Sequence, residues 1–211
     1  MNGELMKLYG VGKSRSFRTI WAAEEAGLNY EYIEVAFGGT EENGSNSEAY
    51  RQLNCQGKVP TMFDDGLVLT ESAAIVNYIA SKNSALNLIP KEGSIDRALY
   101  DQIVFFVLTD LEQPLWTSGK HRFALPKAQR VPQMLETAIW EFEKSQNALK
   151  SMIGEAPEFV LGEQFTMADV LVAHTLIWAD NFKFELSDGF RAYKDRMVER
   201  VACQAALAKL A

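Results

Sequence analysis

The chain has few of the residues that mark disulfide-bonded, metal-binding or strongly basic proteins. Its 211 residues include two cysteines, Cys55 and Cys203, and two histidines, His121 and His174. Cysteines so far apart in the sequence exclude a disulfide framework and a CxxC metal motif, and two isolated histidines argue against a metal site. Lysine and arginine number 21 against 28 aspartates and glutamates. The resulting net charge of −7 provides no basic surface to attract nucleic acid or an anionic membrane.

Long apolar runs are also missing. The longest uninterrupted run, residues 103–108, is far shorter than the roughly 20 residues that a membrane-spanning helix needs. The opening MNGELMKLYG lacks the basic region, apolar run and cleavage site of a signal peptide. A hydrophobic content of 47% is enough to bury a core, which excludes a largely disordered or collagen-like chain. We therefore expect a soluble, cytoplasmic, globular protein.

The first part of the chain alternates strand patterns with helical ones. Alternating residues predict strands at 5–10 and 30–35, while apolar residues at helical spacing predict helices at 16–26 and 72–81. A short helix is expected at 48–53, and residues 59–69 predict a hairpin that turns at Asp64-Asp65-Gly66. The predicted order is βαβαββα over residues 5–82, which describes a small α/β domain with a mixed sheet.

Residues 93–211 have helical periodicity almost throughout. We expect a long helix at 97–116, a second from 127 or 132 to 152, an almost wholly apolar one at 168–180, and an amphipathic segment at 191–210. The apolar helix should lie at the centre of the bundle. The second domain is therefore predicted to be all-helical.

A proline opens the predicted hairpin in the segment Lys58-Val59-Pro60-Thr61. Proline inside a strand removes a hydrogen-bond donor and is confined to edges or special turns. If the bond before Pro60 is cis, the N–H and C=O of Val59 turn outward and can bind the backbone of a short peptide by strand addition. The alternative is a proline that starts a strand and binds nothing.

The segment Thr70-Glu71-Ser72 stands where the helix at 72–81 should begin. A hydroxyl there can cap the helix, and free N–H groups at a helix start attract a carboxylate. Glu71 suits such a site if the ligand also carries an ammonium group, as an α-amino acid does. The alternative is a simple helix cap.

Two serines, Ser14 and Ser16, lie at the start of the first predicted helix. A thiolate placed there is stabilised by the positive end of the helix dipole, and either hydroxyl could donate a hydrogen bond to it. The alternative is that serine caps the helix, a role for which Ser16 is well placed. The loop has too few glycines for a nucleotide-binding motif.

Together these segments resemble the glutathione S-transferase superfamily. The resemblance extends over about residues 6–210 and rests on SRSFR at 14–18, GKVP at 57–60, LTESAAIVNYIA at 69–80 and FTMAD at 165–169. It implies a thioredoxin-like domain at 5–82 and an all-helical domain at 93–211. In FTMAD, Thr166 is expected to cap the following helix, with Asp169 bonding back to the Thr166 N–H, and Phe165 packing on Val170. That last motif is structural.

The resemblance also implies how glutathione would be held. Val59, which precedes Pro60, would pair through its backbone with the cysteinyl part of glutathione. Glu71 and Ser72 would hold the γ-glutamyl head group. Lys58 would lie near the glycyl carboxylate.

The same resemblance implies a catalytic hydroxyl. Ser14 matches the serine that stabilises the thiolate in serine-type classes, with Ser16 as the alternate. Tyr9, at the end of the first strand, is a third candidate because tyrosine-type classes carry their catalytic residue there. The absence of cysteine at positions 13–16 argues against the cysteine-type classes. The implied reaction is transfer of an alkyl or aryl group other than methyl to glutathione, as in detoxification.

A second pocket should take a small hydrophobic electrophile. We expect it between the loop at 11–13 and the helix at 97–116, lined by Val11, Phe105, Leu108, Thr109, Glu112 and Trp116. Ordinary core or subunit packing is the alternative for each residue on that helix. The family resemblance further implies a homodimer. A glutathione-dependent peroxidase or isomerase, or a non-catalytic module of the same fold, are the other functions that remain open.

Overall fold

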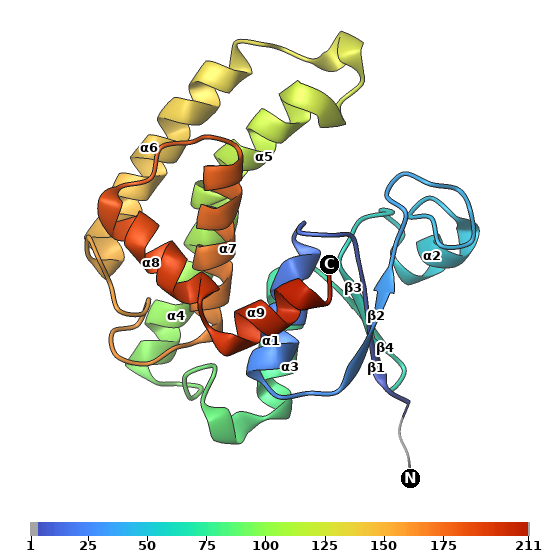
Figure 1. Ribbon diagram of the computed structural model, residues 1–211, viewed down its shortest axis with the longest axis horizontal. Helices are drawn as coiled ribbons and strands as arrows, with labels where there is room; N and C mark the ends of the chain where they lie inside the picture. Colours follow the sequence, from blue (N-terminus) through green and yellow to red (C-terminus); the bar gives the residue numbers. More distant parts are fainter. Residues whose placement is uncertain (1–3, 211) are drawn as a thin grey trace. The chain divides into compact units, whose positions relative to one another are not determined.

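The structure, a computed structural model, describes residues 4–210 of the chain. Those residues form two compact units. The first is drawn from Met1–Ile89 together with Glu199–Ala211, and the second is Pro90–Val198. Figure 1 follows the chain from the first unit into the second and, at its red end, back to the first.

A four-stranded mixed sheet forms the centre of the first unit. The strand order is β2-β1-β3-β4, with β1 (Met6–Gly10), β2 (Tyr30–Glu34), β3 (Thr61–Asp64) and β4 (Leu67–Thr70). β1 is parallel to β2 and antiparallel to β3, which forms an antiparallel hairpin with β4. The predicted mixed sheet is confirmed, and the pairing of Thr61 with both Tyr9 and Thr70 fixes its register.

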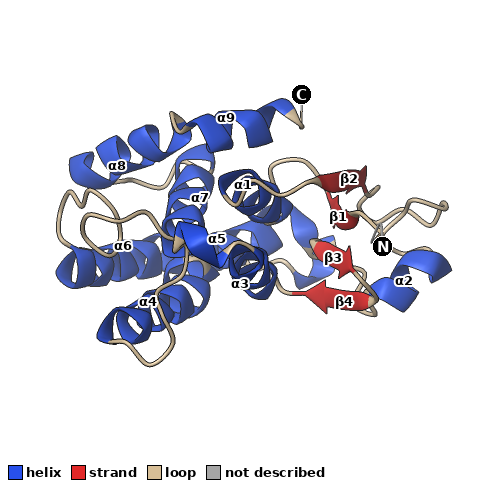
Figure 2. Cartoon of the chain, turned by 90° about the horizontal axis from the view of Figure 1, so that it is seen from below, coloured by secondary structure: helices blue, strands red, loops and turns tan. Residues whose placement is uncertain are grey.

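Two helices pack on one face of this sheet, and a short helix lies on the other (Figure 2). The first unit contains α1 (Ser16–Glu25), α2 (Glu48–Leu53), α3 (Ser72–Lys82), a 3-10 turn (Ser84–Leu86) and α9 (Val201–Ala208). Figure 2 shows α1 and α3 on one side of the sheet and α2 on the other. On β1, Met6 and Leu8 are buried toward the side of α1, whose Ile20 and Trp21 are completely buried. The predicted order βαβαββα is confirmed.

The segment that follows residue 198 packs against α1. Arg200 at the start of α9 forms two hydrogen bonds with the Glu25 carboxylate, Nε to Oε1 at 2.7 Å and Nη2 to Oε2 at 2.8 Å. The Trp21 indole donates to the same carboxylate at 2.9 Å. On α9, Cys203 and Ala206 are completely buried. Sequence analysis groups these residues with the helical half, whereas in the structure they complete the first unit.

The second unit is helical. It contains α4 (Ile95–Phe106), a π-helical turn (Val107–Leu111), α5 (Gln113–Gly119), a second π-helical turn (Lys120–Ala124), a 3-10 turn (Lys127–Gln129), α6 (Met134–Ile153), α7 (Met167–Asn181) and α8 (Asp188–Val198). The single helix expected at 97–116 is wrong, because a π-helical turn interrupts it just before Pro114. Proline lacks an N–H and fits only the first turn of a helix, so α5 begins there. The segment expected at 191–210 is likewise divided, between α8 and α9.

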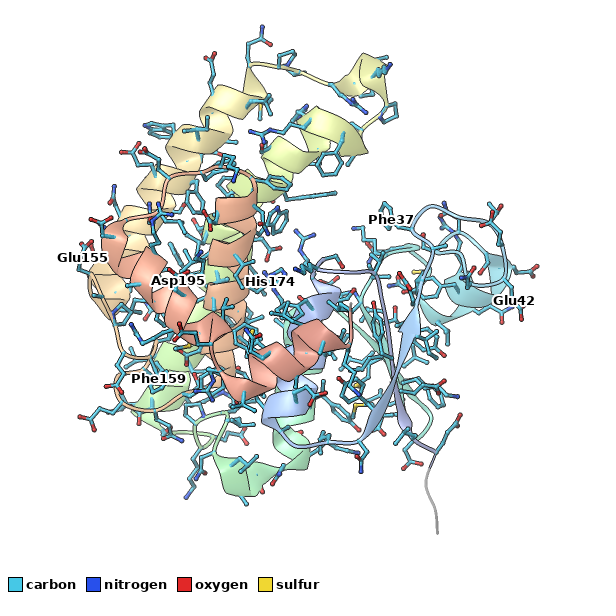
Figure 3. The ribbon with its side chains drawn as sticks, viewed as in Figure 1. Phe37, Glu42, Glu155, Phe159, His174 and Asp195 are labelled. Carbon is cyan, nitrogen blue, oxygen red and sulfur yellow. The ribbon has the colours of Figure 1, made fainter. Side chains whose placement is uncertain are left out.

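The apolar helix α7 lies in the core of the second unit, as predicted. Its residues from Met167 to Leu176 are all buried, including His174, which Figure 3 marks within the helix. The predicted capping box is present: Thr166 N–H donates to Asp169 at 2.8 Å. The Asp169 carboxylate also accepts from the Val160 N–H and the Tyr193 hydroxyl, each at 2.8 Å. Burial nevertheless raises its pKa above the ordinary aspartate value.

Two expected absences can be examined in the described part of the chain. Over residues 4–210, no helix combines the length and the apolar character needed to cross a bilayer. The same residues contain no group of three or more His, Cys, Asp and Glu side chains placed to hold a metal ion.

Candidate functional site

Ser14 and Ser16 form a hydrogen-bonded turn between β1 and α1. The Ser14 hydroxyl donates to Ser16 Oγ at 3.0 Å and accepts from the Ser16 N–H at 3.2 Å. Ser16 Oγ also accepts from the Val11 N–H at 3.3 Å. Ser16 is 1% exposed, whereas Ser14 is half-buried. Ser14 therefore has surface available to a ligand, and Ser16 connects the loop to the helix.

The expectation that Ser16 caps α1 is wrong. Ser16 is the first residue of the helix, and Arg15, which occupies the capping position, makes no capping hydrogen bond with its side chain. The Ser16 hydroxyl points back to the loop because Gly10 leaves room for it. A Cβ on Gly10 would lie 2.5 Å from the Ser16 Cβ, so only glycine permits this close approach. Gly10 is a site-forming residue that sequence analysis missed.

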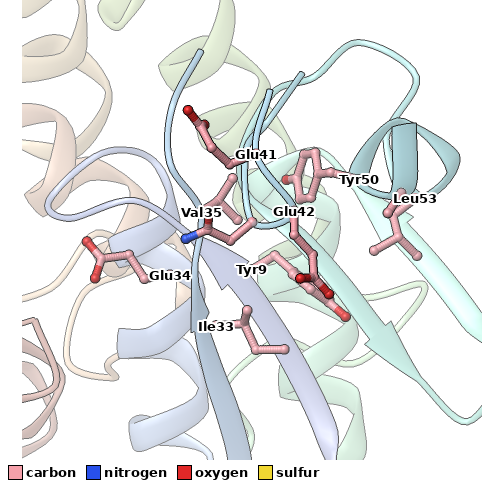
Figure 4. Close-up of a pocket in the computed structure, with 10 residues that line it drawn as sticks. Tyr9, Ile33, Glu34, Val35, Glu41, Glu42, Tyr50 and Leu53 are labelled. Atoms are coloured by element: carbon pink, nitrogen blue, oxygen red, sulfur yellow. The ribbon is translucent and has the colours of Figure 1, made fainter. Parts of the chain in front are cut away.

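Tyr9 lies on the opposite face of the sheet from these serines. Successive side chains of a strand point to opposite faces, and the Gly10 position faces Ser16 on the side of α1. The Tyr9 ring instead packs edge-on against Tyr50 of α2, with ring centroids 6.1 Å apart. There it lines a cavity of about 540 Å³ together with Ile33 and Leu53, as Figure 4 shows. The structure therefore does not bring Tyr9 together with Ser14.

The loop before β3 carries the second group of predicted residues. The Val59–Pro60 peptide bond is cis, Lys58 is exposed, Val59 is half-buried and Pro60 is buried. Within residues 4–210, no group is hydrogen-bonded to the Val59 N–H or C=O. Both are thus open to a ligand.

Two buried side chains of the α2 region hold this loop from behind, and sequence analysis missed both. The Tyr50 hydroxyl donates to the Lys58 carbonyl at 2.7 Å, and Asn54 Nδ2 donates to the same carbonyl at 2.8 Å. Tyr50 and Asn54 each also contact the Thr61 hydroxyl, at 2.9 and 3.1 Å. Burial raises the pKa of Tyr50 above the ordinary tyrosine value, so the hydroxyl keeps the proton that it donates to the Lys58 carbonyl.

The third group lies at the start of α3. Glu71 is exposed and has φ 67° and ψ 114°, a left-handed conformation that is costly for a residue other than glycine. Its side chain does not cap the helix. Ser72 is buried and accepts a hydrogen bond of 3.2 Å from the guanidinium of Arg18, a completely buried residue of α1. Arg18, which sequence analysis quoted only as part of a motif, thus connects α1 to the start of α3.

The sheet register brings these three groups to one edge. β1 is antiparallel to β3, so the end of β1 lies beside the start of β3, where Tyr9 pairs with Thr61. Thr61 also pairs with Thr70, the last residue of β4. The loops that follow β1, precede β3 and follow β4 therefore meet there, and both α1 and α3 begin at that edge. Two helix N-termini give it a positive potential that favours an anionic ligand.

The residues predicted to line a second pocket differ in exposure. Val11 belongs to the first unit and is half-buried. The others belong to the second unit: Phe105 and Thr109 are exposed, Leu108 and Trp116 are half-buried, and Glu112 is buried. That they share a pocket with Val11 stays a prediction.

The two cysteines differ sharply in accessibility. Cys55 is exposed in the loop that leads to Lys58, and Cys203 is completely buried on α9. Burial, with a smaller contribution from Glu25, raises the pKa of the Cys203 thiol to about 12. Cys203 is therefore a neutral core residue at physiological pH.

Comparison with known proteins points to one family. Residues 4–81 match the family described as glutathione S-transferase, N-terminal domain. A glutathione S-transferase of Escherichia coli O157:H7, GstA, is 26% identical over 208 residues, which cover 96% of this chain and 97% of that protein.

Solved structures agree with this family assignment. The theta class glutathione S-transferase of Xanthomonas axonopodis pv. citri, determined with glutathione bound, is 27% identical and has a TM-score of 0.77. The similarity covers 96% of this chain and 97% of that protein. A glutathione transferase from Methylococcus capsulatus str. Bath has the same fold, with a TM-score of 0.86 over 98% of each chain at 24% identity. Residues 4–81 are thus matched by the glutathione S-transferase N-terminal domain family, and the whole chain, with its four-stranded thioredoxin-like domain and its helical second unit, is similar to glutathione S-transferases in sequence and fold.

Proposed function

We propose that this protein is a serine-type glutathione transferase, which transfers alkyl or aryl groups other than methyl. The observation that carries the proposal is the meeting, at one sheet edge, of an accessible serine hydroxyl, an unpaired peptide backbone and a helix start without a side-chain cap. The family supports the coarser part of this statement, and relatives whose structures hold glutathione support glutathione as the substrate.

Glutathione would bind along that edge through its main chain and its charged ends. The free N–H and C=O of Val59 offer one donor and one acceptor to the backbone of the cysteinyl residue. Glu71 supplies a carboxylate for the α-ammonium of the γ-glutamyl group, while Ser72 and the first N–H groups of α3 face its carboxylate. Lys58, which is exposed, would attract the glycyl carboxylate.

Ser14 would activate the thiol. The Ser16 N–H donates to Ser14 Oγ, and this bond polarises the Ser14 hydroxyl, whose proton would turn from Ser16 Oγ to the thiolate when glutathione binds. A free cysteine thiol has a pKa of about 8.5, so only a few per cent is ionised at neutral pH. One hydrogen bond and the N-terminus of α1 can lower this value to about 7, which corresponds to about 2 kcal/mol of thiolate stabilisation.

The thiolate would then attack an electrophilic carbon. A carbon–sulfur bond forms, the leaving group departs with the electron pair of its former bond to carbon, and the thiol proton has already passed to solvent. Ser14 is preferred to Ser16, because the Ser16 hydroxyl is buried and bonded within the loop. It is preferred to Tyr9, because that ring lies on the other face of the sheet.

The second substrate and the assembly are proposed on the family resemblance. We expect a small hydrophobic electrophile to bind near Val11, with Phe105, Leu108, Thr109, Glu112 and Trp116 as the residues to test. We also expect a homodimer that works in the cytoplasm.

Calorimetric titration with glutathione tests the proposal. The wild-type protein should bind glutathione, and Glu71→Ala should bind it at least about tenfold more weakly, since a charged hydrogen bond is lost. Ser14→Ala should keep the affinity but lose the ultraviolet absorbance of bound thiolate, whereas Ser16→Ala should retain that absorbance. Absence of binding by the wild-type protein at millimolar glutathione would refute the proposal.

A further inference from the structure

The Lys58 carbonyl is held by two donors from the α2 region. It accepts from the Tyr50 hydroxyl at 2.7 Å and from Asn54 Nδ2 at 2.8 Å. Both donors are nearly inaccessible: Tyr50 is 4% and Asn54 5% exposed. A carbonyl oxygen has two lone pairs, so both of its acceptor positions are filled.

The other hydrogen-bonding groups of these side chains are also occupied. Asn54 Oδ1 accepts from the Gln56 N–H at 3.1 Å, and Asn54 Nδ2 reaches the Thr61 hydroxyl at 3.1 Å. The Tyr50 hydroxyl contacts that same completely buried Thr61 at 2.9 Å. Neither donor can turn away from Lys58 without breaking a second buried bond, which makes the arrangement rigid.

Fixing this carbonyl also fixes the direction of a neighbouring donor. The Lys58 C=O and the Val59 N–H belong to one peptide group, which is planar and trans, so the two bonds point in opposite directions. With the carbonyl directed at Tyr50 and Asn54, the Val59 N–H points out of the loop, where no group within residues 4–210 accepts from it. Two donors on the carbonyl also polarise the peptide and strengthen its N–H as a donor.

We propose that Tyr50 and Asn54 are positioning residues, which aim the Val59 N–H at the cysteinyl carbonyl of glutathione by holding the Lys58 carbonyl. This role presupposes the glutathione site proposed above and adds a second layer behind it. Neither side chain touches glutathione. Their effect passes through one peptide plane, from the α2 face of the loop to the ligand face.

Two variants remove one donor each with little change of shape. Tyr50→Phe deletes the hydroxyl alone, and Asn54→Asp keeps the acceptor for Gln56 while removing the amide donor. Tyr30→Phe is the matched control: it deletes a hydroxyl that donates to Glu24 at 2.6 Å, in the same unit but at the far end of the sheet. Each variant is titrated calorimetrically with glutathione and with an analogue in which the cysteinyl carbonyl is reduced to a methylene.

The positioning role predicts a loss of affinity that depends on the cysteinyl carbonyl of glutathione. Tyr50→Phe and Asn54→Asp should each weaken glutathione binding about tenfold, but binding of the reduced analogue less than about twofold, because the analogue has no cysteinyl carbonyl to accept from the Val59 N–H. Tyr30→Phe should leave both affinities unchanged. In the wild-type protein the Val59 amide proton resonance should move downfield when glutathione is added, a readout that needs no variant.

The failures are distinguishable. If wild-type protein binds glutathione but Tyr50→Phe and Asn54→Asp bind it equally well, the positioning role is wrong and the glutathione site stands. Equal losses for glutathione and the reduced analogue mean a general structural effect, which also overturns the positioning role. If the wild-type protein does not bind glutathione, both the proposed function and the positioning role are refuted. Should either variant fail to fold, an unmoved Val59 amide resonance in the wild-type protein is enough to refute the role.

Discussion

Replacing Gly10 with alanine tests how tightly the serine turn is packed against the sheet. A Cβ at this position would lie 2.5 Å from Ser16 Cβ, 2.8 Å from Ser16 Oγ and 3.0 Å from Tyr32 Cε2. Carbon atoms in contact are normally about 3.5–4.0 Å apart, so the new methyl group overlaps Ser16 by about 1 Å. Something must therefore move.

The cost follows from how Ser16 is held. Ser16 is 1% exposed, its N–H donates to Ser14, and its hydroxyl accepts from Val11, so a shift strains or breaks these bonds. Overpacking of a core costs about 1–3 kcal/mol, and the lack of free space places Gly10→Ala at about 2–3 kcal/mol. Because Ser14 moves with Ser16, the thiolate absorbance of bound glutathione should fall as well.

Gly119→Ala is the matched substitution. Gly119 ends α5, the chain continues helically into the next turn, and the nearest atoms to an added Cβ are 3.5 Å away. Alanine should raise the free energy of unfolding by about 0.5–1 kcal/mol, since it lowers the entropy of the unfolded chain. Urea unfolding, followed by tryptophan fluorescence and circular dichroism, measures both variants. Equal shifts of the same sign, or no loss for Gly10→Ala, would refute the close-packing argument.

Three further substitutions or reactions have defined outcomes. Arg200→Ala should lower the free energy of unfolding by about 3 kcal/mol in urea, because it leaves the Glu25 carboxylate, whose side chain is 7% exposed, without its cation. At about pH 8, iodoacetamide should modify Cys55 alone, as counted by mass spectrometry, since the buried Cys203 has its pKa raised to about 12 and stays neutral. Asp169→Ala should cost about 3–5 kcal/mol or prevent folding, seen as a fall in melting temperature, because two backbone N–H groups and two hydroxyls lose their buried acceptor.

Each of these outcomes has a control. Arg200→Lys should recover part of the loss, since one cation remains near Glu25 but the two-bond geometry does not. Cys203 should react once urea unfolds the chain, and modification of Cys203 in the folded protein would contradict its burial. Asp169→Asn keeps the shape of the side chain and one acceptor oxygen and should lose less than Asp169→Ala, whereas equal losses would mean that the whole effect comes from the carboxylate and none from packing.

The features that sequence analysis predicted correctly depend on neighbours in the chain. Alternation and helical spacing locate the strands and helices, Asp64-Asp65-Gly66 marks the hairpin, and Thr166 with Asp169 marks the start of α7. Each signal lies within a few residues of the feature that it specifies. For that reason the βαβαββα order and the capping box could be inferred without a structure.

The features that it missed depend on contacts that no local pattern specifies. The face of the sheet on which Tyr9 lies depends on which residues of β1 point toward α1. The structure identifies them through the close approach of Gly10 to Ser16. The hydrogen bonds from Tyr50 and Asn54 to the Lys58 carbonyl join side chains to a backbone atom several residues away. Hydrophobic periodicity does not predict such polar bonds. The packing of α9 on α1 in the first unit likewise depends on tertiary contacts that the local sequence does not specify.

This packing of α9 has a consequence for biosynthesis. The sheet, α1 and α3 leave the ribosome first, but the partner that covers α1 is encoded after the whole of the second unit. Until residues 199–210 have emerged, the surface of α1 that packs against Cys203 and Ala206 is uncovered. Glu25 then also lacks the hydrogen bonds that Arg200 donates to its carboxylate. The first unit to be translated is therefore the last to be finished. Nascent chains that have emerged from the ribosome up to residue 198, but not beyond it, should have an incomplete first unit and a complete helical one.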